Sequence, residues 1–385
     1  MPEDKKKIII YGGSFNPPHT GHIMLAKAAY RQMRPDRFYF VPNFHSPFKE
    51  MQPASFNDRK KMLTLAAGAD FMAQPGVEIS SWEEDQKKTV YTWRTIQHFR
   101  KLHPNHKIYF LMGSDCLQSF WQWQRSRDIL KNATLLAGIR PGFNIVGGEA
   151  PFLPLKGIFP EASSSSIRMD IILRRRTSGI CPAVIDYIKN RGLYFSQEVN
   201  ILRKELSARR YRHCVNVARC AVQLAHLCAV PEYKAAIAGL LHDCAREIDV
   251  EVLKSMRISG PVLGKYRRET VKYAPKLLHA PAGAMLARER YGVKDKDILQ
   301  AIQLHATGMP DMTVLSKIIY MSDYLSEERS FAGIEDLRQL AQTDFDKAFA
   351  EVAAAKARYR ETRKLWGHPL SIQLWEQICS QKKCF

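Results

Sequence analysis

A chain of 385 residues is longer than one typical domain and predicts two or three domains of about 150 residues each. Apolar residues make up 45% and charged residues 25%, which excludes a disordered, collagen-like or all-coiled-coil protein. No run approaches the roughly 20 apolar residues that cross a bilayer, and the first residues lack a secretory pattern. We therefore expect a soluble cytoplasmic protein with no membrane partner.

The charge balance is unusual, because 58 basic and 38 acidic residues give a formal net charge of +20. The excess is spread along the chain and suits anionic ligands such as nucleotides at least as well as a nucleic-acid groove, so nucleic acid is not an expected partner. Eight cysteines are too few for a disulfide scaffold. Four of them, Cys214, Cys220, Cys228 and Cys244, fall in apolar helical patterns and are expected to be reduced.

The first half is predicted to be an α/β domain with a Rossmann-like parallel sheet. Strand-like runs occur at residues 7–11, 38–41, 108–112 and 135–139, and helix-length segments separate them, beginning with a helix after His19. This alternation is typical of parallel strands joined by crossover helices.

The second half is predicted to be all-α, because strand-like runs nearly disappear after Tyr194. Helical periodicity covers residues 200–228, 232–248, 281–291, 296–305, 313–327 and 335–360, and one helix is expected from Arg203 to Cys228. The change of pattern places the domain boundary near residue 195, giving domains 1–195 and 196–385. The tail after residue 345 is expected to be helical and without chemistry.

The first candidate site follows the first strand, in the segment GGSFNPPHTGH. Gly12 and Gly13 allow close approach of a phosphate, and the helix that begins near His19 presents free N–H groups to an anion. His19 and His22 are three residues apart and point the same way within one helical turn, so both imidazoles could donate to phosphate oxygens. A structural turn with two incidental histidines is the alternative.

A second segment, SSSSIR at residues 163–168, places hydroxyl groups before a helix whose Arg168 could reach the same anion. Serines that only cap a helix would also explain it locally. Together the two segments resemble the paired motifs of the HxGH nucleotidylyltransferase superfamily, in which the second element closes over the triphosphate of the nucleotide.

The resemblance is specific to the bacterial nicotinate mononucleotide adenylyltransferases and covers about 190 residues. It rests further on VPNFHSPFK, on Tyr91-Thr92, on GSDCLQSFWQW and on PAVIDYIKNRGLY. It implies transfer of AMP from ATP to nicotinate mononucleotide with Mg²⁺ bound, and it implies two sets of contacts. ATP would contact Gly12, Gly13, Ser14, Phe15, His19, His22, Asp115, Ser163, Ser164, Ser165, Ser166 and Arg168, and the mononucleotide would contact Lys49, Tyr91, Thr92 and Trp123.

Two departures from that family bear on the acceptor. Val90 stands where serine is usual, and Arg94 stands where an acidic residue is usual. Other superfamily members transfer to phosphopantetheine or use CTP, and the HxGH motif alone does not exclude them. The choice between nicotinate and nicotinamide mononucleotide also stays open, because it rests on a few backbone donors in the loop that departs from the family. His19, His22, Lys49 and Arg168 are the groups expected to stabilise the reacting phosphates.

The second candidate site consists of histidines and aspartates at helix faces or ends in the all-α half: His213, His242, Asp243, His279, His305 and Asp323. A carboxylate on an apolar helix face is costly unless it is paired or binds metal. Any one histidine could be a core residue, but six such groups favour a two-metal centre. Imidazole and carboxylate without thiolate suit iron, manganese or zinc, and the metal is expected to be iron.

The order of these residues resembles the HD-domain phosphohydrolases, and specifically the bacterial branch that hydrolyses diadenosine tetraphosphate (Ap4A) symmetrically to two ADP. The resemblance implies that His213, His242, Asp243 and Asp323 hold one metal, that His279 and His305 hold the second, and that Asp243 bridges them. A water between two cations would attack the phosphoanhydride. Arg246 and Arg329 are the expected polyphosphate-binding residues.

Together the two halves predict a bifunctional enzyme whose ligands are ATP, nicotinate mononucleotide and dinucleoside polyphosphates. The alternatives are that the HD half acts on another nucleotide phosphoanhydride or phosphoester, or that the chain is a basic RNA-associated protein with degenerate sites. Disposal of adenylylated by-products could link the two activities, on the sole ground that they share one chain. The sequence leaves a homo-oligomer open.

Overall fold

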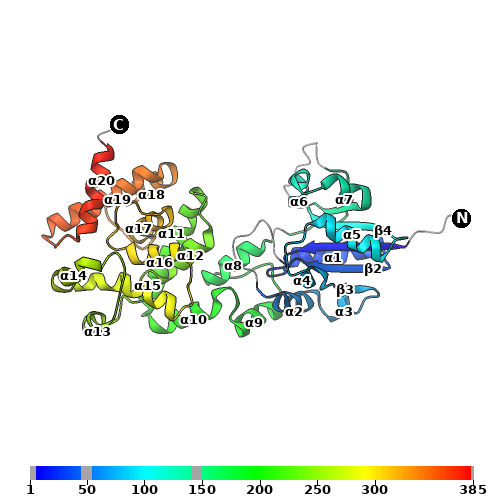
Figure 1. Ribbon diagram of the computed structural model, residues 1–385, viewed down its shortest axis with the longest axis horizontal. Helices are drawn as coiled ribbons and strands as arrows, with labels where there is room; N and C mark the ends of the chain where they lie inside the picture. Colours follow the sequence, from blue (N-terminus) through cyan, green and yellow to red (C-terminus); the bar gives the residue numbers. More distant parts are fainter. Residues whose placement is uncertain (1–5, 45–53, 140–149, 161, 383–385) are drawn as a thin grey trace. The chain divides into compact units, whose positions relative to one another are not determined.

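The computed structural model describes residues 6–44, 54–139, 150–160 and 162–382. The chain divides into two compact units, one of Met1–Ile171 with Arg175–Tyr194 and one of Ile172–Arg174 with Phe195–Phe385 (Figure 1). None of the described helices combines the length and the apolar character needed to span a bilayer.

The first unit is built on a sheet of six parallel strands in the order β3-β2-β1-β4-β5-β6. The strands are β1 (Lys7–Gly13), β2 (Arg37–Pro42), β3 (Val77–Ile79), β4 (Lys107–Gly113), β5 (Thr134–Gly138) and β6 (Phe152–Leu155). The predicted α/β fold with a parallel sheet is thus confirmed. The sequence did not predict β3 and β6, the two short strands at the edges of the sheet.

Helices cover both faces of this sheet. The helices of this unit are α1 (Thr20–Met33), α2 (Phe56–Ala67), α3 (Ala69–Met72), α4 (Trp82–Asp85), α5 (Thr92–Leu102), α6 (Ser114–Gln118), α7 (Ser126–Asn132), α8 (Ser164–Ile172) and α9 (Pro182–Arg191), of which α8 and α9 pack on α2. Side chains alternate along a strand, so Ile9 and Tyr11 pack against α1–α3 while Ile8 and Ile10 pack against α5–α7. Burial on both faces explains why the strands read as continuous apolar runs.

The carboxyl ends of the strands mark the position of the first site. β1 lies between β2 and β4, and the direction of strand order reverses between β1 and β4. In open α/β sheets such a reversal leaves a crevice at the carboxyl ends of the strands, where ligands bind. Gly12 and Gly13 close β1 at this end, and Gly113 closes β4.

The second unit is helical, which confirms the all-α prediction. Its helices are α10 (Ser196–Glu205), α11 (Ala208–Leu227), α12 (Glu232–Leu241), α13 (Val250–Ser255), α14 (Arg267–Tyr273), α15 (His279–Glu289), α16 (Lys296–Leu304), α17 (Val314–Leu325), α18 (Ile334–Thr343), α19 (Phe345–Thr362) and α20 (Pro369–Lys382). Helices α11, α12, α16 and α17 pack on one another, and α15 packs on α16.

Two expected helices are each divided in the structure. The helix expected from Arg203 to Cys228 is interrupted at Leu206 and Ser207, where the Ser207 side chain accepts a hydrogen bond from the N–H of Arg210 and begins α11. The helix expected over 335–360 is interrupted at Asp344, whose side chain caps α19. In both cases a capping side chain starts a new helix without any glycine or proline.

Candidate functional site

The glycine turn of the first unit leads into a helix that two histidines cap. His19 is the N-cap of α1: its Nδ1 accepts from the N–H of His22 at 3.3 Å, and the Nδ1 of His22 accepts from the N–H of His19 at 3.1 Å. The two rings stack with centroids 3.6 Å apart. A Cβ on Gly21 would lie 3.1 Å from the His19 ring, so glycine leaves room for this stacking.

These contacts define the protonation of both rings. A nitrogen that accepts a hydrogen bond carries no proton, so the neutral form of each imidazole has its proton on Nε2. His19 and His22 are therefore oriented by the backbone to offer Nε2–H as a donor. Such paired donors at a helix N-terminus suit a phosphate oxygen.

The two motifs recognised in the sequence meet in the structure. Ser164 Oγ donates to the carbonyl of Pro17 at 2.9 Å, and Arg168 donates to the carbonyl of Asn16 at 2.6 Å. Ser165 Oγ accepts from the same guanidinium at 3.0 Å. Arg168 is thus held over the turn between β1 and α1.

Arg59 supports this turn from behind, a role that sequence reasoning missed. Its side chain is 1% exposed and donates to the carbonyls of Ser14 and Ala54, each at 3.0 Å. A fully buried arginine with carbonyl partners on the phosphate turn is a positioning group. The basic character of this position was visible in the sequence, but its burial was not.

A cavity of about 820 Å³ opens at the strand ends, beside this turn. Of the predicted contact residues, its lining includes Gly12, Gly13, Ser14, His22, Tyr91, Thr92 and Trp123. The Phe15 side chain instead lies fully buried in the core, so only its backbone could face a ligand. Lys49 lies outside the described residues, and so does the side chain of Asp115, whose backbone lies in α6.

Glu83 also lines the cavity, and sequence reasoning gave it no role. Its carboxyl is buried, and Oε1 accepts from Thr95 Oγ1 at 2.6 Å. Among the described residues Oε2 has no hydrogen-bond partner. Burial raises the pKa of Glu83 to about 7, because the charged form loses its hydration.

We expect Glu83→Gln to stabilise the first unit above pH 7. The pKa of Glu83 is about 7 in the folded chain, against a reference value of 4.5, so the native residue's contribution to stability is present below pH 4.5 and lost as pH rises through 7. Glutamine mimics the protonated form. The gain in unfolding free energy should reach about 3 kcal/mol at most above pH 7 and vanish near pH 4.5.

Thermal unfolding of the first unit between pH 4.5 and 8.5 measures this difference. The exposed Asp85, in the same helix, provides the matched control Asp85→Asn. A Glu83→Gln advantage that is the same at all pH values would contradict the assigned burial of the charge.

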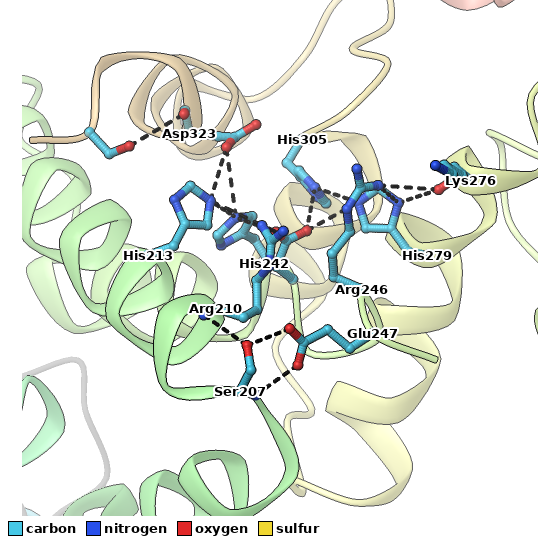
Figure 2. A network of polar contacts seen from close by, with 12 residues as sticks. Ser207, Arg210, His213, His242, Arg246, Glu247, Lys276, His279, His305 and Asp323 are labelled. Atoms are coloured by element: carbon cyan, nitrogen blue, oxygen red, sulfur yellow. Dashed lines mark hydrogen bonds and ion pairs between the residues drawn. The ribbon is translucent and has the colours of Figure 1, made fainter. Parts of the chain in front are cut away.

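The second unit brings all six predicted histidines and aspartates together (Figure 2). His213 comes from α11, His242 and His305 stand at the carboxyl ends of α12 and α16, and His279 begins α15. Asp243 follows His242. A Cβ on Gly239 would come within 2.7 Å of Ala218, so glycine permits the close crossing of α11 and α12 that brings His213 and His242 together.

Asp243 lies between two pairs of histidines. Its Oδ1 is 3.2 Å from His279 Nε2 and 3.5 Å from His305 Nε2. Its Oδ2 is 3.6 Å from His242 Nε2 and 3.8 Å from His213 Nε2. Asp323 Oδ1 lies 3.2 Å from His213 Nε2. Asp243 therefore has the position of a carboxylate that two sets of ligands share.

The Nε2 atoms within each histidine pair face each other, at 3.2 Å for His213 and His242 and at 3.1 Å for His279 and His305. Hydrogen bonds at Nδ1 orient three of these rings: His242, His279 and His305 lie 2.5–2.7 Å from the carbonyl three residues earlier. Nδ1–H donation leaves an Nε2 lone pair, and facing lone pairs are favourable only with a cation or a proton between them. This donor set fits two divalent cations that share Asp243.

The pKa shifts of Asp243, Asp323 and His242 agree with a site that fits divalent cations. Burial alone would raise the pKa of Asp243, but His242, His279 and His305 hold it well below its usual range. Burial would likewise raise the pKa of Asp323, and His213 and Lys356 lower it. Burial lowers the pKa of His242 to about 4, so this ring is a neutral ligand at pH 7.

Two arginines predicted to hold polyphosphate lie beside opposite halves of the cluster. Arg329 donates to Asp323 Oδ1 at 3.1 Å, and Arg246 lies 3.0 Å from His279 Nδ1 and 3.4 Å from the Lys276 carbonyl. Each of the two arginines therefore contacts a residue of the cluster.

Three further residues contact the cluster and were missed in the sequence. Arg210 donates to Asp243 Oδ2 at 2.6 Å, Glu328 pairs with His213 Nδ1, and Lys356 of α19 donates to the Tyr320 carbonyl at 3.1 Å and to the His305 carbonyl at 3.4 Å. Arg210 stands three residues before His213, and this helical spacing could have indicated from the sequence that Arg210 lies near the cluster. Lys356 belongs to the tail to which the sequence assigned no chemistry, and its contact with the cluster is a structural one, to the backbone of His305.

Comparison with known proteins matches each unit to a separate family. The Cytidylyltransferase-like family model matches residues 10–170, and the HD domain model matches residues 210–328. A Mycoplasma genitalium protein named as a probable nicotinate-nucleotide adenylyltransferase/Ap4A hydrolase is 29% identical over 352 residues, which cover 90% of this chain and 96% of that protein.

Two relatives match one half each. A symmetrical bis(5'-nucleosyl)-tetraphosphatase from Halalkalibacterium halodurans is 36% identical, over 50% of this chain and 100% of that protein. A Staphylococcus epidermidis protein named as a probable nicotinate-nucleotide adenylyltransferase is 30% identical, over 49% of this chain and 97% of that protein.

Proposed function

The chain belongs to the nicotinate-nucleotide adenylyltransferases through its first unit and to the HD-domain symmetrical bis(5'-nucleosyl)-tetraphosphatases through its second, and we propose that it carries both activities. We assign the transferase to residues 1–195 and the hydrolase to residues 196–385. The observation that carries the proposal is that one chain holds both a histidine-capped phosphate turn and a cluster of histidine pairs sharing a carboxylate.

In the first reaction, a phosphate oxygen of nicotinate mononucleotide forms a bond to the α-phosphorus of ATP, and the bond to pyrophosphate breaks. The nucleophile is already an anion, so no general base is required. The residues align two negatively charged groups and offset the charge on the equatorial oxygens. The Nε2–H groups of His19 and His22 and the guanidinium of Arg168 supply that stabilisation, and Mg²⁺ supplies further positive charge when bound.

Nicotinate is the proposed acceptor in preference to nicotinamide. Tyr91 and Thr92 line the cavity where α5 begins, and no side chain of the described residues caps that helix end. Uncapped N–H groups and the positive end of the helix favour a carboxylate over a neutral carboxamide. Trp123, packed edge-on against Phe110 with centroids 6.2 Å apart, offers an aromatic face for the pyridine ring.

In the second reaction, water adds to Ap4A and two ADP leave. We propose that His213, His242, Asp243 and Asp323 hold one divalent ion and that His279, His305 and Asp243 hold the other, with iron as the expected metal. Such a pair lowers the pKa of the attacking water and offsets charge on the phosphoanhydride. Burial lowers the pKa of His242 and of His279, which favours the neutral ligand form of these two rings, and all four histidines are buried from bulk water.

A product assay tests both assignments on the full chain. With ATP and Mg²⁺, nicotinate mononucleotide should give nicotinate adenine dinucleotide and pyrophosphate, with a higher kcat/KM than nicotinamide mononucleotide. With Fe²⁺ or Mn²⁺, Ap4A should give ADP as its only nucleotide product on chromatography. Formation of AMP and ATP from Ap4A would contradict the symmetrical assignment.

A further inference from the structure

A cavity of about 460 Å³ lies beside the His213 half of the cluster, and arginines line it. Its lining comprises Arg209, Arg210, Arg212, His213, Asn216, Glu328 and Arg329. Four arginines and one glutamate thus line this cavity, and two of the arginines, Arg210 and Arg329, pair with Asp243 and Asp323 of the cluster. Glu328 is already engaged, because it pairs with His213 Nδ1 and accepts from Asn216 at 2.9 Å.

The arginines near the beginning of α11 lower the stability of this helix when no anion is bound there. Arg209, Arg212, His213 and Asn216 follow the spacing i, i+3, i+4 and i+7, which places them on one face. The first turn of α11 contains no acidic residue. Cations near a helix N-terminus are disfavoured by the helix dipole, so an anion bound there would remove a cost that the free chain carries.

The cavity adjoins the histidine cluster. His213 belongs to both, Arg210 reaches Asp243 Oδ2 at 2.6 Å, and Arg329 reaches Asp323 Oδ1 at 3.1 Å. The Nε of Arg210 is buried and has no hydrogen-bond partner among the described residues. An anion that enters the cavity would therefore meet a donor next to the histidine cluster.

Cationic groups flank the opposite half of the cluster as well. Arg246 lies 3.0 Å from His279 Nδ1, on the side of His279 and His305, whereas Arg210 extends from α11 (Figure 2). An anion that contacts both groups must extend across both histidine pairs.

We propose that Arg209 and Arg212, on one face of α11, bind the outer phosphates of a polyphosphate chain whose inner phosphates reach the histidine cluster. The inference rests on the proposed hydrolase function. In that reaction the oxygen of water bonds to an inner phosphorus, and the bond from this phosphorus to the central bridging oxygen breaks. One ADP leaves with the bonding electrons, and the proton of the water passes to solvent.

The test uses the full metal-loaded chain and the variant Arg209→Gln/Arg212→Gln. Both side chains are exposed and contact no residue of the histidine cluster in any described hydrogen bond, so the fold and the metal content should persist. We expect kcat/KM for Ap4A to fall at least tenfold and the Kd for inorganic tripolyphosphate, from calorimetry, to rise by a similar factor. Arg209→Lys/Arg212→Lys should keep most of both, because the charge is retained.

The matched control is Arg203→Gln/Lys204→Gln, which removes two exposed charges from α10 outside the cavity lining. It should leave both values unchanged. Tripolyphosphate bound in the first unit contributes equally in all variants, so the Kd compared is that of the separate binding component that the titration assigns to the second unit.

The outcomes separate the inference from the function on which it rests. If the unmodified chain does not cleave Ap4A but the glutamine variant still loses tripolyphosphate affinity, the hydrolase assignment fails and the polyphosphate site stands. If the glutamine variant keeps its tripolyphosphate affinity, or keeps its kcat/KM on an active enzyme, the inference is wrong. It is also wrong if the unmodified chain binds no tripolyphosphate.

Discussion

His242→Ala should abolish Ap4A hydrolysis and leave adenylyl transfer intact. His242 is fully buried, and its Nε2 faces both His213 and Asp243, so alanine removes a neutral imidazole that we propose as a metal ligand. We expect a loss of about 1,000-fold or more, which corresponds to about 4 kcal/mol of transition-state stabilisation. The metal content of the purified chain should fall in parallel, as elemental analysis can measure.

The exposed His226 gives a matched control, because it lies on α11 and pairs only with Glu232 in the described contacts. His226→Ala should keep both activities and the metal. Loss of adenylyl transfer in His242→Ala would show that the two sites are not independent.

His19→Ala should have the opposite effect, lowering adenylyl transfer and sparing hydrolysis. Removing one preorganised donor to a developing negative charge typically costs about 100-fold to 1,000-fold in kcat. Alanine also removes the N-cap of α1, which should cost about 1 kcal/mol of stability. Steady-state kinetics and thermal unfolding measure the two effects separately.

His19→Asn distinguishes catalysis from capping. Asparagine is a strong N-cap and can accept from the N–H of His22, but it does not reproduce the Nε2–H donor. We therefore expect stability to return while transfer stays low. Full recovery of transfer in His19→Asn would mean that His19 acts only through the helix.

The fold was largely predictable because its elements have strong local signals. β1, β2, β4 and β5 are buried on both faces and read as apolar runs. β3 has three residues and β6 contains Pro154, so neither shows a strand pattern by itself. Both form because the neighbouring strand offers hydrogen bonds, and an edge strand tolerates the missing N–H of proline.

The sequence indicated candidate residues for both sites, but it did not indicate the burial or the hydrogen-bond partners of their side chains. The glycine turn, the paired histidines and the HD pattern stand out because their spacing is local or resembles known families. Glu83 and Lys356 gave no such signal. Glu83 is buried against Thr95, and Lys356 reaches His305 from 51 residues away.

By itself the sequence predicted two domains and their fold classes, and it indicated phosphate chemistry in the first and metal chemistry in the second, since hydrophobic periodicity and short motifs are properties of adjacent residues. Tertiary structure alone decided which nitrogen each imidazole presents, which carboxyl is buried, and that Arg59 lies behind the phosphate turn. The physical reason is that hydrogen-bond partners and desolvation come from residues far apart in the chain, which only packing brings into contact.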